Sequence, residues 1–137
     1  MKTYQKTIEL KTKKLHDFVN ITKDVAEVVN ETGISNGMVF VNAPHTTVGL
    51  ILQENDETIF HDMKKMFERI LPPDSNYKHS SEGKDNAIAH ITSNLLGTSL
   101  AMPVTKRQIE LGNWQNIFLV ELFEGRVRKV VVTVIGE

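Results

Sequence analysis

The stretch that decides the fold is residues 117–135, which read IFLVELFEGRVRKVVVTVI. Both halves are rich in the β-branched and aromatic side chains that strands favour. The dipeptide Glu124-Gly125 between the two halves is typical of a tight turn. We therefore expect a strand over residues 117–123 and a long, alternating or buried strand over residues 126–135.

The rest of the chain adds strands and helices to this pair. Apolar and β-branched runs predict further strands over residues 4–10, 18–21, 37–41, 48–52 and 99–104. Apolar residues at helical spacing predict helices over residues 23–31, 56–71 and 87–96. The second helix has an apolar stripe made of Ile59, Phe60, Met63, Met66, Phe67 and Ile70. In the third helix we expect Ile88, Ile91 and Leu95 to point toward a core. The fold class is therefore a sheet-rich α+β domain with about three helices.

Length and composition limit the classes of function. The 137 residues fit a single domain spanning residues 1–137, with a net charge of -1 and no cysteine. The absence of cysteine excludes disulfides, thiolate nucleophiles and cysteine-based metal sites. The balanced charge, with only six Phe, two Tyr and one Trp, argues against nucleic acid or a membrane as a partner. No apolar run has the length of a signal peptide or membrane span, so we expect a cytoplasmic protein.

Three histidines are the best candidates for chemistry. His45 follows a predicted strand and precedes Thr46 and Thr47, an arrangement that can ligate a metal or hold an anion. His79 lies in a long polar loop, and His90 lies on the helix that follows it. Asn86, His90 and Asn94 are four residues apart, so they lie on one face of that helix. The alternatives are a turn whose hydroxyls cap the backbone and a solvated helix face.

Other polar residues are weaker candidates. Glu82 lies between the two later histidines and could orient them. Arg107 follows a strand and could bind phosphate, although a solvated turn is the favoured explanation when the residue is taken in isolation. Trp114, the only tryptophan, could stack on a planar ligand or belong to the core. His61 lies on the charged face of the second helix, and we expect it at the surface.

These residues together carry a family resemblance. The matching motifs are His45-Thr46-Thr47-x-Gly49-Leu50, Glu54-Asn55, His79-x-x-Glu82-x-x-x-Asn86, Ala89-His90, Leu96-Gly97-x-Ser99, Leu111-Gly112-Asn113-Trp114-Gln115, Glu121 and Gly125-Arg126. In this order they resemble the YjbQ-like family, also described as secondary thiamine-phosphate synthases. The resemblance extends from about residue 5 to Gly136, nearly the whole chain.

The resemblance implies a β-rich, sandwich-like fold, a homotrimer, and a site near the subunit contacts. It also implies thiamine-phosphate synthase-like activity, a transferase that joins hydroxymethylpyrimidine diphosphate to thiazole phosphate and releases pyrophosphate. On this interpretation, the enzyme binds a small phosphorylated molecule as its partner and uses no organic cofactor. The alternative is a non-catalytic trimer that binds a metal or a phosphorylated ligand.

Residue roles follow from this reading. His45, His79 and His90 would bind a divalent metal, zinc or magnesium, or contact the diphosphate, and these histidines with Glu82 would be the catalytic residues. The expected substrate-binding residues are Thr46, Thr47, Asn86, Arg107, Trp114 and Gln115.

Overall fold

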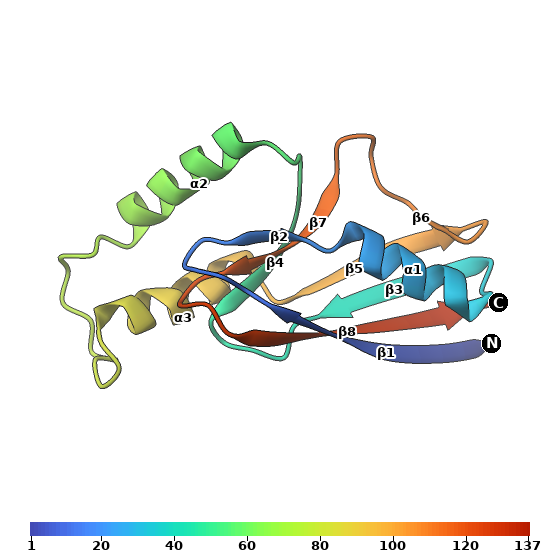
Figure 1. Cartoon of the computed structure of the whole chain (residues 1–137), viewed down its shortest axis with the longest axis horizontal. Coiled ribbons are helices and arrows are strands. Elements are labelled where there is room, and N and C mark those ends of the chain that lie inside the picture. Colours follow the sequence, from blue (N-terminus) through green and yellow to red (C-terminus); the bar gives the residue numbers. More distant parts are fainter.

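The computed structural model describes residues 1–137 and consists of eight strands and three helices (Figure 1). The strands are β1 (Lys2–Lys11), β2 (Phe18–Asn20), β3 (Asn36–Asn42), β4 (Val48–Gln53), β5 (Ser99–Thr105), β6 (Gln108–Ile109), β7 (Asn116–Glu121) and β8 (Val127–Gly136). The helices are α1 (Thr22–Thr32), α2 (Glu57–Ile70) and α3 (Lys84–Leu96). The predicted α+β class with three helices is confirmed. No helix here is both long and apolar enough to cross a membrane.

The strands form two antiparallel sheets. The larger sheet has the order β1-β8-β3-β5-β6, and the smaller has the order β2-β7-β4. The two strands of the fold-deciding stretch therefore belong to different sheets, and the turn around Gly125 passes from one layer to the other. At Gly125 an added Cβ would lie 2.6 Å from the carbonyl oxygen of Lys13, so this crossing leaves room only for glycine.

The smaller sheet is the middle layer of the molecule. Its β7 residues Ile117 and Leu119 face the larger sheet and α1, in a core that includes Val39 and Val132. The next residues of β7, Phe118 and Val120, face the other way, toward α2 and α3. Since both faces of β7 are covered, its sequence is continuously apolar rather than alternating.

The two outer helices bury less apolar surface than their sequences predict. Only Phe60 of the α2 stripe is buried, while Met66 and Ile70 are more than half exposed. The prediction for α3 is wrong in part, because Ile91 and Leu95 are exposed and small residues such as Ala89 and Ser93 are buried instead. Small side chains allow α3 to lie close against β4.

Close contact between α3 and β4 gives a stability prediction at Gly49. A Cβ at this position would lie 2.7 Å from Cδ1 and 2.9 Å from Cβ of Leu96. We expect Gly49→Ala to lower the free energy of unfolding by about 1–3 kcal/mol, because the helix must shift to relieve the overlap. Urea denaturation followed by circular dichroism measures this. A Gly49→Ala protein as stable as the wild type would show that α3 is not packed this tightly.

Candidate functional site

A polar depression lies between the 43–47 loop and one face of α3. It has two overlapping lobes that share His45, Thr46 and His90. We call this depression the hollow. The first lobe also contains Ser93, Asn94, Gly97 and Thr98. The second lobe also contains Pro44, Thr47, Glu82, Asn86, Arg126 and Arg128. Apart from the ring of Pro44, no hydrocarbon side chain lines either lobe.

Backbone and side-chain hydrogen bonds hold the two walls of the hollow together. The N–H of Ala43 donates to the carbonyl of Thr98 over 2.8 Å, which ties the 43–47 loop to the start of β5. Ser93 Oγ donates to the carbonyl of Val48 over 2.5 Å, which fixes α3 to β4. The two walls are therefore parts of a connected frame, and His45 and His90 hold defined positions across it.

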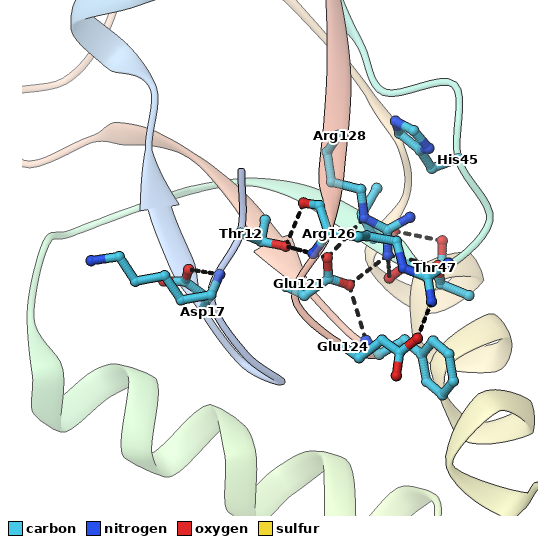
Figure 2. Close-up of polar contacts among 12 residues, drawn as sticks. Thr12, Asp17, His45, Thr47, Glu121, Glu124, Arg126 and Arg128 are labelled. Carbon is cyan, nitrogen blue, oxygen red and sulfur yellow. Dashed lines mark hydrogen bonds and ion pairs between the residues drawn. The ribbon is translucent and has the colours of Figure 1, made fainter. Parts of the chain in front are cut away.

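The floor of the hollow is a buried ion pair between Arg128 and Glu121 (Figure 2). Nε and Nη2 of Arg128 donate to the two carboxylate oxygens of Glu121 over 2.8 and 2.6 Å. Nη2 also donates to Oγ1 of Thr47 over 2.8 Å. Thr12 Oγ1 donates to the same carboxylate over 2.6 Å. The pair lies at the end of the layer between the two sheets, where Arg128 follows the inward-facing register of Val130, Val132 and Val134.

One nitrogen of this arginine remains available to a ligand. Nε and Nη2 make every hydrogen bond of the Arg128 guanidinium, so Nη1 has no protein partner. No side-chain polar atom without a partner is buried in the structure, so Nη1 is accessible. Arg128 is only 3% exposed, and it lines the second lobe. The small exposed surface of Nη1 therefore faces the hollow. A fixed, desolvated guanidinium N–H is a strong donor for an anion.

Glu121 remains ionised beside this arginine. Burial by itself would raise the pKa of Glu121, but hydrogen bonds from Arg128, Thr12 and the Phe123 N–H outweigh it and hold the pKa below its ordinary value of 4.5. A carboxyl whose pKa is lower when folded stabilises the fold above its unfolded pKa. This contribution is present above about pH 4.5 and is lost as the pH falls through the folded-state pKa.

His45 projects a defined hydrogen-bond donor. Its Nε2 accepts the backbone N–H of Lys129 over 2.9 Å, so this nitrogen carries no proton. Burial, and then the positive charge of Arg128, lower the pKa of His45 below its ordinary value of 6.5. A neutral imidazole whose Nε2 accepts must carry its proton on Nδ1. His45 therefore resembles an N–H donor for an anion more than a metal ligand, since one lone pair is engaged and the other nitrogen is protonated.

This tautomer is directly measurable. In ¹⁵N-labelled protein at pH 7, we expect the His45 ring to show a protonated Nδ1 and an unprotonated Nε2 in long-range ¹H–¹⁵N spectra. The His45 ring should also titrate at lower pH than a histidine of ordinary pKa. A protonated Nε2 on His45 at pH 7 would contradict the hydrogen bond from Lys129 and, with it, the assigned role.

Asn86 and His90 line the opposite wall, and His79, which lines neither lobe, contacts both of them. Nε2 of His79 lies 3.1 Å from Oδ1 of Asn86. An amide oxygen only accepts, so Nε2 of His79 carries the proton. The rings of His79 and His90 meet edge to face with centroids 4.9 Å apart. His90 makes no side-chain hydrogen bond and lines both lobes, so its ring nitrogens are free to meet a ligand.

The remaining predicted residues divide between the hollow and distant loops. Glu82 lines the second lobe, but it is Asn86 that bonds a histidine. Arg107 lies in the β5–β6 turn, at the far end of the β3–β5 ladder from the 43–47 loop, roughly 20 Å away along the strands (Figure 1). Trp114 lies in the β6–β7 loop and is 73% exposed, and Gln115 accepts the Gly112 N–H within that loop. None of these three residues lines the hollow within one chain.

The three histidines predicted to bind a metal are not arranged as a metal site within a single chain. No group of three or more His, Asp or Glu side chains is arranged to hold a metal ion. His79 and His90 lie together, whereas Nε2 of His45 is engaged by the backbone. Binding of zinc or magnesium stays a prediction, and we derive no step through a metal.

Sequence reasoning missed Arg128, Ser93 and Thr98. The sequence did contain a signal for Arg128. It alternates along β8 with the buried Val130, Val132 and Val134, so its side chain lies on the same, inward face of the strand. Glu121 similarly ends a run of four buried apolar residues in β7. Two opposite charges at inward positions of successive strands, here β7 and β8 of the two facing sheets, predict a buried pair. Ser93 and Thr98 had no distinguishing pattern.

Comparison with known proteins agrees with this fold. The family model described as UPF0047 protein YjbQ-like matches residues 6–137. The chain belongs to the YjbQ-like UPF0047 family. The UPF0047 protein YjbQ of Escherichia coli O157:H7 is 38% identical over 137 residues, covering 98% of this chain and 99% of the relative. The UPF0047 protein YugU of Bacillus subtilis is 33% identical over 132 residues, covering 96% and 98%. A YbjQ-like protein of unknown function from Sulfolobus solfataricus superimposes with a TM-score of 0.93 at 31% identity, covering 99% of each chain.

These findings confirm the family and correct the predicted activity. The YjbQ-like relatives have only an uncharacterised family name, and the Sulfolobus structure is described as a protein of unknown function. The prediction of a thiamine-phosphate synthase-like transferase is therefore wrong as an assignment for this family. The function has to be argued from the hollow itself.

Proposed function

We propose that the hollow binds the oxyanion of a small phosphorylated molecule and that the protein is an enzyme acting on it by proton transfer. The observation that carries this proposal is the free Nη1 of Arg128. A guanidinium that is 3% exposed has lost most of its hydration, and its one unpartnered nitrogen opens into the hollow. An anion that meets this nitrogen gives it a charged acceptor.

The surrounding donors support an oxyanion rather than a cation. Nδ1 of His45 carries a proton, and Arg126 adds a second guanidinium to the same lobe. Thr46 adds a hydroxyl that makes no hydrogen bond within the chain. Several N–H and O–H donors that line one lobe suit the oxygens of a phosphate group. The carboxylate of Glu121 is neutralised by Arg128 and does not repel such a ligand.

The histidine pair supports a catalytic role. His90 borders both lobes, so it lies beside any ligand anchored at Arg128 and extending toward Asn94. His79 packs against the His90 ring and is itself held by Asn86. An oriented imidazole next to a bound phosphate compound is suited to general acid or base catalysis. Glu82, on the same lobe, is a second proton-transfer candidate.

Calorimetric titration with inorganic phosphate tests the binding half of the proposal. We expect saturable binding by the wild type and about 10- to 100-fold weaker binding by His45→Ala, since a hydrogen bond to a charged group is lost. His45→Asn should retain part of the affinity, because its amide N–H takes a position similar to Nδ1–H. His61→Ala is the matched control, since that ring lies on the exposed face of α2. Equal affinity in His45→Ala and His61→Ala would refute the site.

Turnover tests the catalytic half. A panel of phosphorylated compounds should include a substrate that the wild type converts and that His90→Ala binds but does not convert. Conversion by His90→Ala at the wild-type rate would remove the proposed role of His90. Phosphate binding with no conversion of any compound would favour a binding protein.

We also propose that the protein assembles as a homotrimer through the outer face of its larger sheet. Support comes from the apolar residues on that face, which no other element of the chain covers. They include Phe40, which is 39% exposed, and the half-buried Met38, Val131 and Ile135 of neighbouring strands. Exposed apolar clusters of this kind on a sheet are typical of contact surfaces.

A further inference from the structure

We infer that the ligand of the hollow is a sugar monophosphate, that is, a polyhydroxy compound with one phosphate group. This inference rests on the proposed function, which supplies the phosphate, and adds the chemistry of the rest of the ligand. The basis is the unequal charge of the two lobes. The second lobe is lined by two arginines, Arg126 and Arg128, and by one acid, Glu82, whereas the first lobe contains no Arg, Lys, Asp or Glu.

The size of the hollow exceeds that of a phosphate ion. The first lobe has a volume of about 340 Å³ and the second about 380 Å³. Pockets for small organic ligands begin at roughly 300 Å³. A phosphate at Arg128 therefore leaves the first lobe for the remainder of the molecule. The two lobes meet at His45, Thr46 and His90, so the two parts of the ligand would join beside His90.

The lining of the first lobe specifies what that remainder is. Most small-molecule pockets are predominantly hydrophobic. This lobe instead consists of two imidazoles, three hydroxyl side chains, one carboxamide and a glycine. An apolar group placed there would gain little and would separate these polar groups from water. A group with several hydroxyls would replace the lost water contacts.

Asn94 is the side chain best suited to recognise hydroxyls. Its carboxamide makes no hydrogen bond within the chain, and it lies one turn of α3 beyond His90. A carboxamide offers two donors and an oxygen acceptor, and a pair of sugar hydroxyls can satisfy both kinds. Thr98, across the lobe, adds a hydroxyl that is likewise free of protein partners. A second phosphate would find no cationic side chain at this end, so the geometry points to a monophosphate.

Calorimetric titrations of the full chain with inorganic phosphate, ribose 5-phosphate and phenyl phosphate test this inference. We expect ribose 5-phosphate to bind at least about tenfold more tightly than phenyl phosphate. Asn94→Ala should weaken ribose 5-phosphate binding about tenfold, since two hydrogen bonds are lost, and leave the affinity for inorganic phosphate unchanged. The matched control is Asn30→Ala, an exposed asparagine on α1, which should change none of the three affinities.

The outcomes separate this inference from the proposed function. If inorganic phosphate binds but phenyl phosphate binds as tightly as ribose 5-phosphate, the sugar assignment is overturned and the anion site stands. The same conclusion follows if Asn94→Ala binds ribose 5-phosphate as well as the wild type does. If none of the three ligands binds, the proposed function itself fails. Circular dichroism of Asn94→Ala would show that the fold is retained.

Discussion

Replacing Arg128 with methionine is expected to lower the free energy of unfolding by about 3–5 kcal/mol, which is the usual cost of removing one partner of a buried ion pair. Methionine fills much of the same space, so the loss arises mainly from Glu121. Its carboxylate is fully buried and would keep only the hydrogen bonds from Thr12 and the Phe123 N–H. Urea denaturation at pH 7 measures the difference.

Arg126→Met is the control for this prediction. Arg126 is also paired with a glutamate, Glu124, but both side chains are largely exposed to solvent. An exposed pair contributes about 0–1 kcal/mol, so this variant should be nearly as stable as the wild type. The double variant Glu121→Gln with Arg128→Met should recover part of the loss, because no buried charge remains. Equal stability of Arg128→Met and Arg126→Met would show that the buried pair is not formed in solution.

If the proposed homotrimer forms, replacing Phe40 with aspartate is expected to give monomers with one-third of the wild-type mass, as measured by light scattering coupled to size-exclusion chromatography. Phe40 lies on β3, between Thr133 of β8 and Ala101 of β5, near the middle of the uncovered sheet face. A carboxylate there would have to be desolvated when subunits meet, and no cationic partner lies opposite it within the chain.

Met66→Asp on α2 tests the competing surface. This methionine is 51% exposed and belongs with Ile70 to another exposed apolar area, on α2. We expect Met66→Asp to retain the wild-type mass. Monomers from Met66→Asp, with an intact assembly in Phe40→Asp, would place the subunit contact on α2 and contradict the proposed use of the sheet.

Most of the fold was predictable because its strands and helices have clear local patterns. The apolar spacing of α1 and the β-branched run of β8 predicted a helix and a strand, and three valines of each are buried: Val25, Val28, Val29, Val130, Val132 and Val134. What the sequence did not predict was the arrangement of layers. The turn at Gly125 resembles a hairpin turn, yet β7 and β8 pair with other strands. Local turn chemistry does not determine whether the chain continues in the same sheet or crosses to the next one. The exposure of Ile91 and Leu95 was also not predictable, because an apolar helix face that stays exposed in the chain has the same sequence pattern as one that faces a core.

The candidate site was predictable in part, for a similar reason. His45 and His90 were identifiable as residue types suited to chemistry, and both line the hollow. The donor character of His45 depends on a backbone N–H that is 84 residues away in sequence, so no local pattern could indicate it. Arg107 and Trp114 were proposed from their chemistry alone, and the β3–β5 and β4–β7 ladders hold them at the opposite ends of the sheets from the 43–47 loop.

The most direct test of the anion site is a phosphate titration of ¹⁵N-labelled protein in which the side-chain resonances of Arg128 and the ring resonances of His45 and His61 are followed together. We predict that the Arg128 guanidinium and the Nδ1–H of His45 shift along one saturable curve while His61 does not move. Shifts that are equal for His61 and His45, or an Arg128 guanidinium that does not respond to phosphate, would contradict the assignment of the hollow as an anion-binding site.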